Sequence, residues 1–152
     1  MLEAWRIVKR RQAPAAFTGD GAARTGGRWN SRGVSVVYTS STQALAALET
    51  LVHLNPPVLF KYVAIRIQFP EALVETLPTA SLPRNWRTEP PPPSTKAIGD
   101  TWVWEGRSAI LALPSVIIAK ELNYLINPAH PGFNTITIGK REPFSFDPRL
   151  LE

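Results

Sequence analysis

Cysteine is absent from this chain of 152 residues, which also contains only two histidines and one methionine. Without cysteine the chain can form no disulfide, no thiolate nucleophile and no cysteine-based zinc site. The two histidines, His53 and His130, lie far apart in the sequence, which argues against a histidine-rich metal site. The sequence therefore predicts no bound metal, and any chemistry must come from arginine, carboxylate, hydroxyl and backbone groups.

Long hydrophobic runs are also missing. No stretch of about 18 consecutive apolar residues occurs, so the sequence predicts no membrane-spanning helix. The first residues, MLEAWRIVKRRQ, have no apolar segment behind their charges, so no secretory signal is expected and the predicted location is the cytoplasm. With 44% hydrophobic residues, a chain of this length suits one ordinary core, and we expect residues 1–152 to form a single domain.

Positive charge is concentrated at the start of the chain. Residues 1–32 contain seven basic and two acidic side chains, and this excess of five equals the net charge of the whole chain. Such a segment suits an anionic partner, which could be nucleic acid, a phosphorylated metabolite or an acidic protein. A solvated basic face is an equally common outcome. The charges form no helical stripe and no nucleic-acid-binding motif occurs, which argues against a nucleic-acid-binding module.

Alternating and β-branched segments predict six or seven strands. They cover residues 4–10, 34–40, 60–69, 72–77 and 134–139, together with two apolar strands in 108–126 broken at Pro114. One good helix is expected from Thr42 to Leu54, begun by a capping box of Ser40 and Gln43 and stopped by Pro56 and Pro57. A glycine-rich loop is expected from Ala13 to Gly27, a short helix between Ser94 and Trp104, and a closing helical turn at Asp147–Pro148.

The centre of the chain is rich in proline. This proline-rich segment, residues 78–93, contains Trp86, and two further tryptophans follow it at positions 102 and 104. Tryptophans in and beside such a segment favour a loop packed on the domain over a free linker. Because the helices are few and do not alternate regularly with the strands, the predicted fold class is α+β with a mixed sheet.

Glu49 occupies an unusual place on the expected helix. At about 100° per residue, an apolar face is filled by Ala44, Leu45, Leu48, Leu51 and Val52. Glu49 falls just beyond Leu45, at the border of this face. A boundary glutamate exposed to water explains the position by itself. A carboxylate at the rim of a core is also where a cleft would present one.

Arg28 follows two glycines in the stretch TGGRWNSRG. Glycines allow backbone geometry and close approaches that other residues do not, and an arginine after them can present its planar fork to a phosphate or carboxylate. Gly-Gly-Arg also occurs in many surface turns. Trp29, the next residue, is expected in the core. The stretch matches neither a P-loop nor a dinucleotide-binding fingerprint.

A third group of polar residues interrupts the apolar stretch LPSVIIAKELNYLINPAHPGF. Ser115 opens it, and Asn123, Asn127 and His130 follow. Buried polar groups need partners, and turn capping accounts for Asn127, which precedes a proline. Ser108 is a competing hydroxyl. No Gly-x-Ser-x-Gly elbow surrounds either serine, which argues against a hydrolase triad.

Taken together, three stretches resemble the RES-domain family, which is named for its arginine, glutamate and serine. They are GGRWNSRGVSVVYTSSTQALAALET, the Ser115 stretch above and FDPRL, in this order along nearly the whole chain. The family comprises toxins of bacterial toxin–antitoxin pairs with Xre-type antitoxins. The resemblance implies a fold like that of ADP-ribosyltransferases, NAD as the substrate, and an antitoxin that covers the cleft, with nucleic acid reached only through the antitoxin.

The resemblance also assigns residues. The family's arginine, glutamate and serine correspond to Arg28, Glu49 and Ser115, with Ser108 as the alternative serine, and the strand's aromatic residue corresponds to Tyr38. The expected catalytic residues are Arg28, Tyr38, Glu49 and Ser115, and the expected NAD-binding residues are Arg6, Arg28, Asn30 and Tyr38. Glu49 would stabilise an oxocarbenium-like ribose while neutral nicotinamide leaves. Arg28 would hold a phosphate or ribose oxygen, and Arg6 would contact a second phosphate. Tyr38 would stack on nicotinamide, and Ser115 would hydrogen-bond the ribose or orient Glu49.

Three functions remain open from the sequence. The first is a toxin that depletes NAD by hydrolysis or phosphorolysis. The second is a mono-ADP-ribosyltransferase that passes the ribose to a protein. The third is a non-catalytic basic module that binds through residues 1–32. The first two functions differ in the group that receives the ribose. The third requires no catalysis and therefore does not need Glu49.

Overall fold

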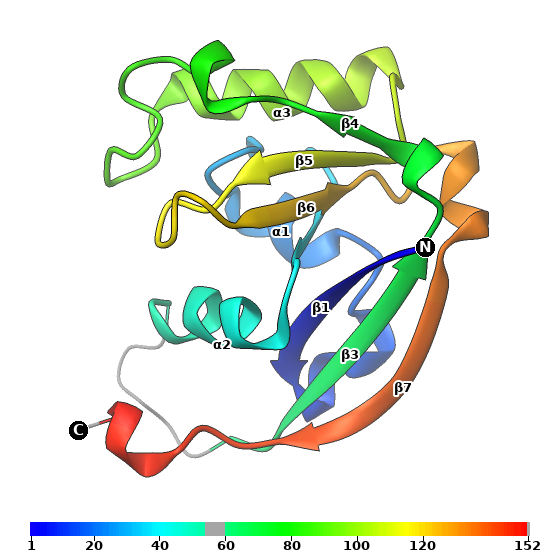
Figure 1. Ribbon diagram of the computed structural model, residues 1–152, viewed down its shortest axis with the longest axis vertical. Helices are drawn as coiled ribbons and strands as arrows, with labels where there is room; N and C mark the ends of the chain where they lie inside the picture. The colour runs from blue at the N-terminus through cyan, green and yellow to red at the C-terminus, as the bar shows by residue number, and fades with distance from the viewer. Residues whose placement is uncertain (54–59, 152) are drawn as a thin grey trace.

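The computed structural model describes residues 1–53 and 60–151. One seven-stranded sheet runs through it in the order β4-β5-β6-β2-β1-β3-β7 (Figure 1). The strands are β1 (Leu2–Lys9), β2 (Val37–Ser40), β3 (Tyr62–Phe69), β4 (Val74–Thr76), β5 (Ile110–Pro114), β6 (Leu122–Ile126) and β7 (Thr137–Phe144). β4 and β5 pair in parallel, and the other neighbours pair antiparallel. The predicted α+β class with a mixed sheet is confirmed.

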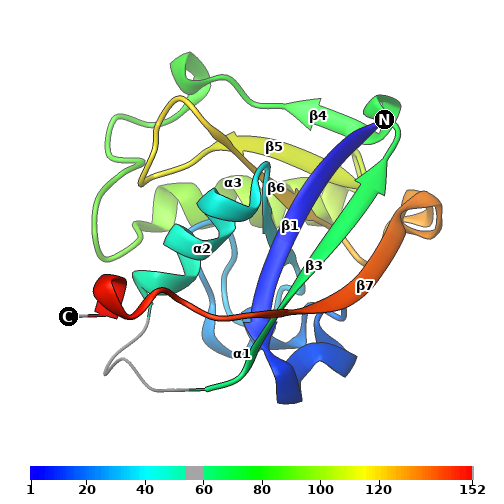
Figure 2. The same ribbon diagram turned by 60° about the horizontal axis from the view of Figure 1, so that its bottom comes forward.

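The sheet is narrow at its middle. β1 pairs with β2 at a single position, Trp5 opposite Ser40, whereas β1 and β3 pair along their whole length. The two halves, β4-β5-β6-β2 and β1-β3-β7, therefore diverge on either side of this junction, and Figure 2 shows them at different angles. The helix α2 (Gln43–Leu51) follows β2 and lies at this divergence, in contact with both β1 and β2.

Within the described residues, three α-helices accompany the sheet: α1 (Asp20–Thr25), α2 (Gln43–Leu51) and α3 (Pro93–Glu105). The same residues form the short 3-10 turns η1 (Arg10–Ala15), η2 (Glu71–Leu73), η3 (Thr79–Ser81), η4 (Pro131–Thr135) and η5 (Pro148–Leu151). α3 and η5 confirm the predicted short helix and closing turn. α3 lies along one side of the β4-β5-β6 half (Figure 1). In the described parts of the chain, no helix has the length and hydropathy needed to cross a membrane.

Two predictions about local structure are wrong. The capping box does not begin at Ser40, which belongs to β2. The N-cap is Thr42, whose hydroxyl accepts a hydrogen bond from the Leu45 amide at 3.1 Å. Residues 13–27 are not one loop, because the end of η1 and the whole of α1 fall within them. Gly19, with φ of 80°, permits the turn from which α1 begins. The helix expected to reach Leu54 ends earlier, at Leu51, with Val52 as its C-cap, and the expected stop at Pro56 and Pro57 lies outside the described residues.

Most strand predictions are confirmed, with shorter limits in places. The segment predicted over 34–40 becomes a strand only at Val37. The Val34 carbonyl instead accepts a hydrogen bond from the side chain of Asn30 at 3.1 Å, which takes it out of sheet pairing. The first apolar strand ends at Pro114 as expected. This places Ser115 immediately after the end of β5.

The core is built largely from the sheet residues and the tryptophans. Trp102 on α3 is fully buried, and Trp29 is 3% exposed, as predicted. Trp86 is 9% exposed and packs in the same cluster as both. The proline-rich segment is therefore packed on the domain, which confirms that interpretation. Trp104 differs from the others, since it projects from α3 into solvent.

Candidate active site

The carboxylate of Glu49 is held by two side chains from the β5-β6 hairpin. One oxygen, Oε1, accepts hydrogen bonds from the Ser115 hydroxyl at 2.8 Å and from the Asn123 amide nitrogen at 2.9 Å. Ser115 is fully buried, and Asn123 lies on β6. Glu49 comes from α2 and lies 66 residues before Ser115 and 74 before Asn123 in the sequence. The structure thus brings Glu49 and Ser115 together and adds Asn123.

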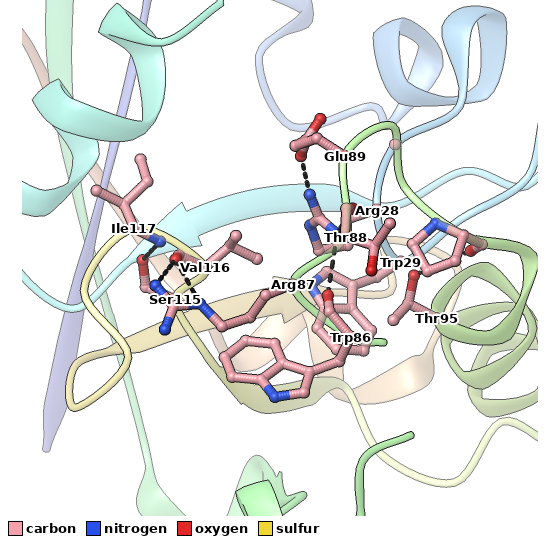
Figure 3. A network of polar contacts seen from close by, with 12 residues as sticks. Arg28, Trp29, Trp86, Arg87, Thr88, Glu89, Thr95, Ser115, Val116 and Ile117 are labelled. Atoms are coloured by element: carbon pink, nitrogen blue, oxygen red, sulfur yellow. Dashed lines mark hydrogen bonds and ion pairs between the residues drawn. The ribbon is translucent and has the colours of Figure 1, made fainter. Parts of the chain in front are cut away.

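The hydroxyl of Ser115 also has two backbone partners. It accepts hydrogen bonds from the amides of Ile117 and Ile118, both at 3.1 Å, and Figure 3 shows the first of these. Its one hydrogen is therefore directed at Glu49. Ser108 makes different contacts, accepting from the Trp102 indole at 2.8 Å and donating to the Ile110 carbonyl at 3.0 Å. Of the two candidate serines, Ser115 is the one that contacts Glu49.

Arg28 is anchored by the proline-rich segment. Its Nη1 donates to the carbonyls of Trp86 at 2.9 Å and Thr88 at 2.8 Å, and its Nη2 donates to the carboxylate of Glu89 (Figure 3). Its side chain is 9% exposed. Burial lowers the pKa of Arg28, while the negative charge of Glu49 acts in the opposite direction. Arg28 therefore lies within the electrostatic reach of Glu49.

The proline-rich segment reaches the serine side of the site as well. The Arg87 guanidinium donates through Nε and Nη2 to the Val116 carbonyl, at 3.1 and 2.8 Å. Figure 3 shows Arg87 extending from the segment toward the turn that follows Ser115. The segment is thus fixed at Arg28 and again at Val116. Sequence analysis gave it no role, because its partners lie far away along the chain.

Tyr38 and Asn30 form a hydrogen-bonded pair beside the backbone at Arg28. The Tyr38 hydroxyl donates to Asn30 Oδ1 at 2.5 Å and accepts from the Trp29 amide at 3.1 Å. Burial raises the pKa of this phenol above its usual range. A Cβ atom on Gly27 would lie 2.6 Å from the Tyr38 hydroxyl, so this glycine allows the close approach. Asn30 is itself fully buried.

The loop that carries Arg28 is fixed from the other side by α3. Lys96 donates to the Gly27 carbonyl at 2.6 Å, and Asp100 accepts from the Ser31 amide and hydroxyl at 2.8 and 2.5 Å. A Cβ atom on Gly99 would lie 1.6 Å from the Trp29 carbonyl oxygen. These residues were not predicted from the sequence. The available signal was a glycine followed by an aspartate inside the expected helix, which favours a close contact with a neighbouring segment.

Arg6, on β1, lies next to Tyr38. Its Nε donates to the Ala16 carbonyl at 2.7 Å, and its Nη1 donates to the Tyr38 carbonyl at 3.0 Å. Burial lowers the pKa of Arg6 to about 10. Arg6 therefore fixes β2 and the turn after η1 relative to β1.

Other polar residues of the Ser115 stretch lie away from Glu49. Asn127 accepts a hydrogen bond from the Ala129 amide at 3.0 Å, as expected of a turn-capping residue. His130 caps η4 by accepting from the Gly132 amide at 2.9 Å. A hollow of about 450 Å³ also lies elsewhere, lined by Lys9, Arg10, Arg11, Phe60 and Lys61. Within residues 1–53 and 60–151, no three acidic or histidine side chains are grouped closely enough to share a metal ion.

Comparison with known proteins agrees on one family. The family model described as the RES domain matches residues 3–147. A protein named "Prs ADP-ribosylating toxin" from Sphingobium sp. (strain YBL2) is 40% identical, covering 97% of this chain and 95% of its own length. One named "Toxin Res" from Yersinia enterocolitica is 38% identical, covering 96% and 97%.

A solved structure shows the same fold at low sequence identity. It is the crystal structure of the M. tuberculosis MbcT-MbcA toxin-antitoxin complex, with a TM-score of 0.75 and 16% identity, covering 95% of this chain and 84% of that one. The sequence matches span nearly the whole chain. The chain belongs to the RES domain family.

Proposed function

We propose that this protein is the toxin of a toxin–antitoxin pair and that it breaks the bond between nicotinamide and ribose in NAD. The observation that carries the proposal is the Glu49 carboxylate, which is oriented by hydrogen bonds from Ser115 and Asn123. The relatives named as toxins, one of them ADP-ribosylating, support the same activity.

The chemistry suits a site of this composition. The bonding pair of the glycosidic bond leaves with nicotinamide, which becomes neutral, so that no acid is needed to protonate the leaving group. Positive charge develops on the ribose, as at other glycosidic centres. A carboxylate that accepts a hydrogen bond from a ribose hydroxyl then becomes more stabilising as the reaction proceeds. Water or phosphate adds at the ribose carbon and releases a proton to solvent.

The other residues receive binding roles in this proposal. Arg28 exchanges the Glu89 carboxylate for a phosphate of NAD, because both are anions that accept from its fork. The Tyr38 ring stacks on nicotinamide, and Asn30 acts by holding the Tyr38 hydroxyl, since Asn30 itself is buried. Arg6 contributes positive charge near the phosphates while it supports the backbone at Tyr38.

Transfer of the ribose to a protein is the second candidate function. The name of the 40% identical relative, an ADP-ribosylating toxin, favours it. Both candidates share the same bond cleavage and differ only in the acceptor. Depletion of NAD needs water or phosphate, whereas ADP-ribosylation needs a protein nucleophile at the ribose carbon.

The proposed partner is an antitoxin protein that covers the site. The neighbour of known structure was solved as a toxin-antitoxin complex, which supports such a partner. The family resemblance further implies an antitoxin of the Xre type, through which the complex would reach nucleic acid. Co-expression with an antitoxin of this type should yield one complex that releases no nicotinamide. If wild-type protein expressed alone leaves growth and cellular NAD unchanged, the toxin assignment is wrong.

One incubation tests the proposal. The purified protein is mixed with NAD, with and without phosphate or a cell lysate, and free nicotinamide is measured. Release without lysate, abolished by Glu49→Gln, supports NAD depletion; release only with lysate, together with labelled protein, supports transfer. If no mixture releases nicotinamide, the enzymatic proposal fails. Anion binding that falls steeply with salt and survives Glu49→Gln would instead favour a basic binding module.

A further inference from the structure

Both donors to Glu49 contact the same oxygen. Ser115 and Asn123 each donate to Oε1, at 2.8 and 2.9 Å. From the described parts of the chain, no hydrogen bond reaches Oε2. The two oxygens of this carboxylate therefore have different roles: one is bound to the protein, and the other is left for a ligand.

The direction of each of these hydrogen bonds is fixed. An ionised carboxylate can only accept, so the nitrogen of the Asn123 amide must face Glu49 and its oxygen must face away. That oxygen, Oδ1, accepts from the Ser40 hydroxyl at 2.8 Å. Ser115 accepts from two backbone amides and so has its only hydrogen free for Glu49. None of these groups can rotate without losing a partner.

The sheet explains why Asn123 is in place. Asn123 lies directly opposite Ser40 in the antiparallel pairing of β6 with β2, so that the two side chains share one face of the sheet. β6 lies between β5 and β2, away from either edge. The Asn123 side chain is thus held by a central strand of the sheet, and a rigid support of this kind keeps the Glu49 carboxylate in one orientation.

We infer that Asn123 is a positioning residue, which together with Ser115 fixes Oε1 of Glu49 so that Oε2 accepts the hydrogen bond from a substrate ribose hydroxyl. The inference rests on the proposed function. It assigns Ser115 to the same task, because a hydroxyl with its hydrogen on Glu49 and two amides on its lone pairs is not available to attack the ribose. The nucleophile that takes the ribose must then be a group other than Ser115.

The test compares steady-state release of nicotinamide by the wild type with that by Asn123→Ala, Asn123→Asp, Ser115→Ala and Ser115→Thr. A lost hydrogen bond to a charged group should lower kcat roughly tenfold to hundredfold in the two alanine variants. KM for NAD should stay within about twofold, because the fall arises in the transition state. Asn123→Asp should be slower still, since it places a second carboxylate beside Oε1. Ser115→Thr, which keeps the hydroxyl, should recover most of the rate lost in Ser115→Ala.

Two matched controls separate positioning from folding. Asn127→Ala and Ser108→Ala remove comparable buried hydrogen bonds that do not involve Glu49. They should lower the melting temperature but leave kcat near that of the wild type. The inference is overturned if Asn123→Ala keeps the wild-type kcat, or if the control variants lose as much rate as it does. A wild type that releases no nicotinamide in any mixture overturns the proposed function and the inference with it.

Discussion

The guanidinium of Arg28 donates to the carboxylate of Glu89, which joins the loop before β2 to the proline-rich segment. The pair is asymmetric, because the Arg28 side chain is 9% exposed and the Glu89 side chain is 70% exposed. Arg28 is also bound to the carbonyls of Trp86 and Thr88. The arginine is therefore a fixed cation, while its carboxylate partner lies at the surface, where an incoming anion could replace it.

This asymmetry predicts the behaviour of Glu89→Gln. If an NAD phosphate replaces Glu89, removing the carboxylate should lower KM for NAD by up to about fivefold, because an exposed ion pair contributes about 0.2–1 kcal/mol. The kcat should not change, since Glu89 leaves before the bond breaks. Glu105→Gln, which removes an exposed carboxylate paired with Arg107, is the control and should leave KM unaltered. A higher KM in Glu89→Gln would mean that Glu89 holds Arg28 in its binding position.

The variant Arg28→Lys tests whether the positive charge of Arg28 is sufficient or whether its planar guanidinium is needed. Lysine keeps the positive charge but lacks the planar fork that reaches Trp86, Thr88 and Glu89 together. We expect KM for NAD to rise about tenfold or more, in line with a lost hydrogen bond to a charged group. The proline-rich segment should also be cut faster by a protease that cleaves after Arg84 or Arg87. Unchanged cleavage with a raised KM would show that Arg28 binds substrate without anchoring the segment.

Local patterns in the sequence predicted most of the fold. The alternation in residues 60–69 and the apolar run before Pro114 led directly to β3 and β5. The helix α1 was missed because Gly19 and Gly21 suggested a loop, whereas Gly19 supplies the turn and Gly21 is tolerated inside the helix. The order of the strands could not be predicted from the sequence, because it depends on pairings between distant segments such as β2 with β6.

The candidate residues of the site could be picked out from the sequence, but the hydrogen bonds between them could not. Glu49 was identified by its position at the border of an apolar helix face, Arg28 by the two glycines before it, and Ser115 by the apolar stretch that it opens. The family resemblance then assigned these three residues to one site. Asn123 was noticed as a polar residue in a buried stretch, but its partners Glu49 and Ser40 come from other elements. Only the folded arrangement shows which of these side chains meet.

Gly99 tests how α3 supports the Arg28 loop. A Cβ at this position would lie 1.6 Å from the Trp29 carbonyl oxygen, so Gly99→Ala must push α3 away from the loop. The free energy of unfolding should fall by about 1–3 kcal/mol or more, as for other overpacked cores. Urea denaturation measures this. Gly21→Ala is the matched control: a Cβ there meets nothing within 4 Å, so stability should be unchanged or slightly higher. Equal stability of the two variants would contradict the close packing of α3 on Trp29.

The two parts of the Tyr38 side chain can be tested separately. Tyr38→Phe keeps the ring and removes the hydroxyl, which leaves Asn30 Oδ1 and the Trp29 amide without this partner. Unpaired buried polar groups cost about 1–3 kcal/mol each, so the melting temperature should fall. The kcat should stay close to that of the wild type, because stacking on nicotinamide needs only the ring. Tyr38→Leu, which fills similar space without an aromatic ring, should instead weaken NAD binding and slow nicotinamide release. If Tyr38→Leu turns over NAD as fast as Tyr38→Phe, the ring does not contact nicotinamide, and Tyr38 serves only to hold the loop that carries Arg28.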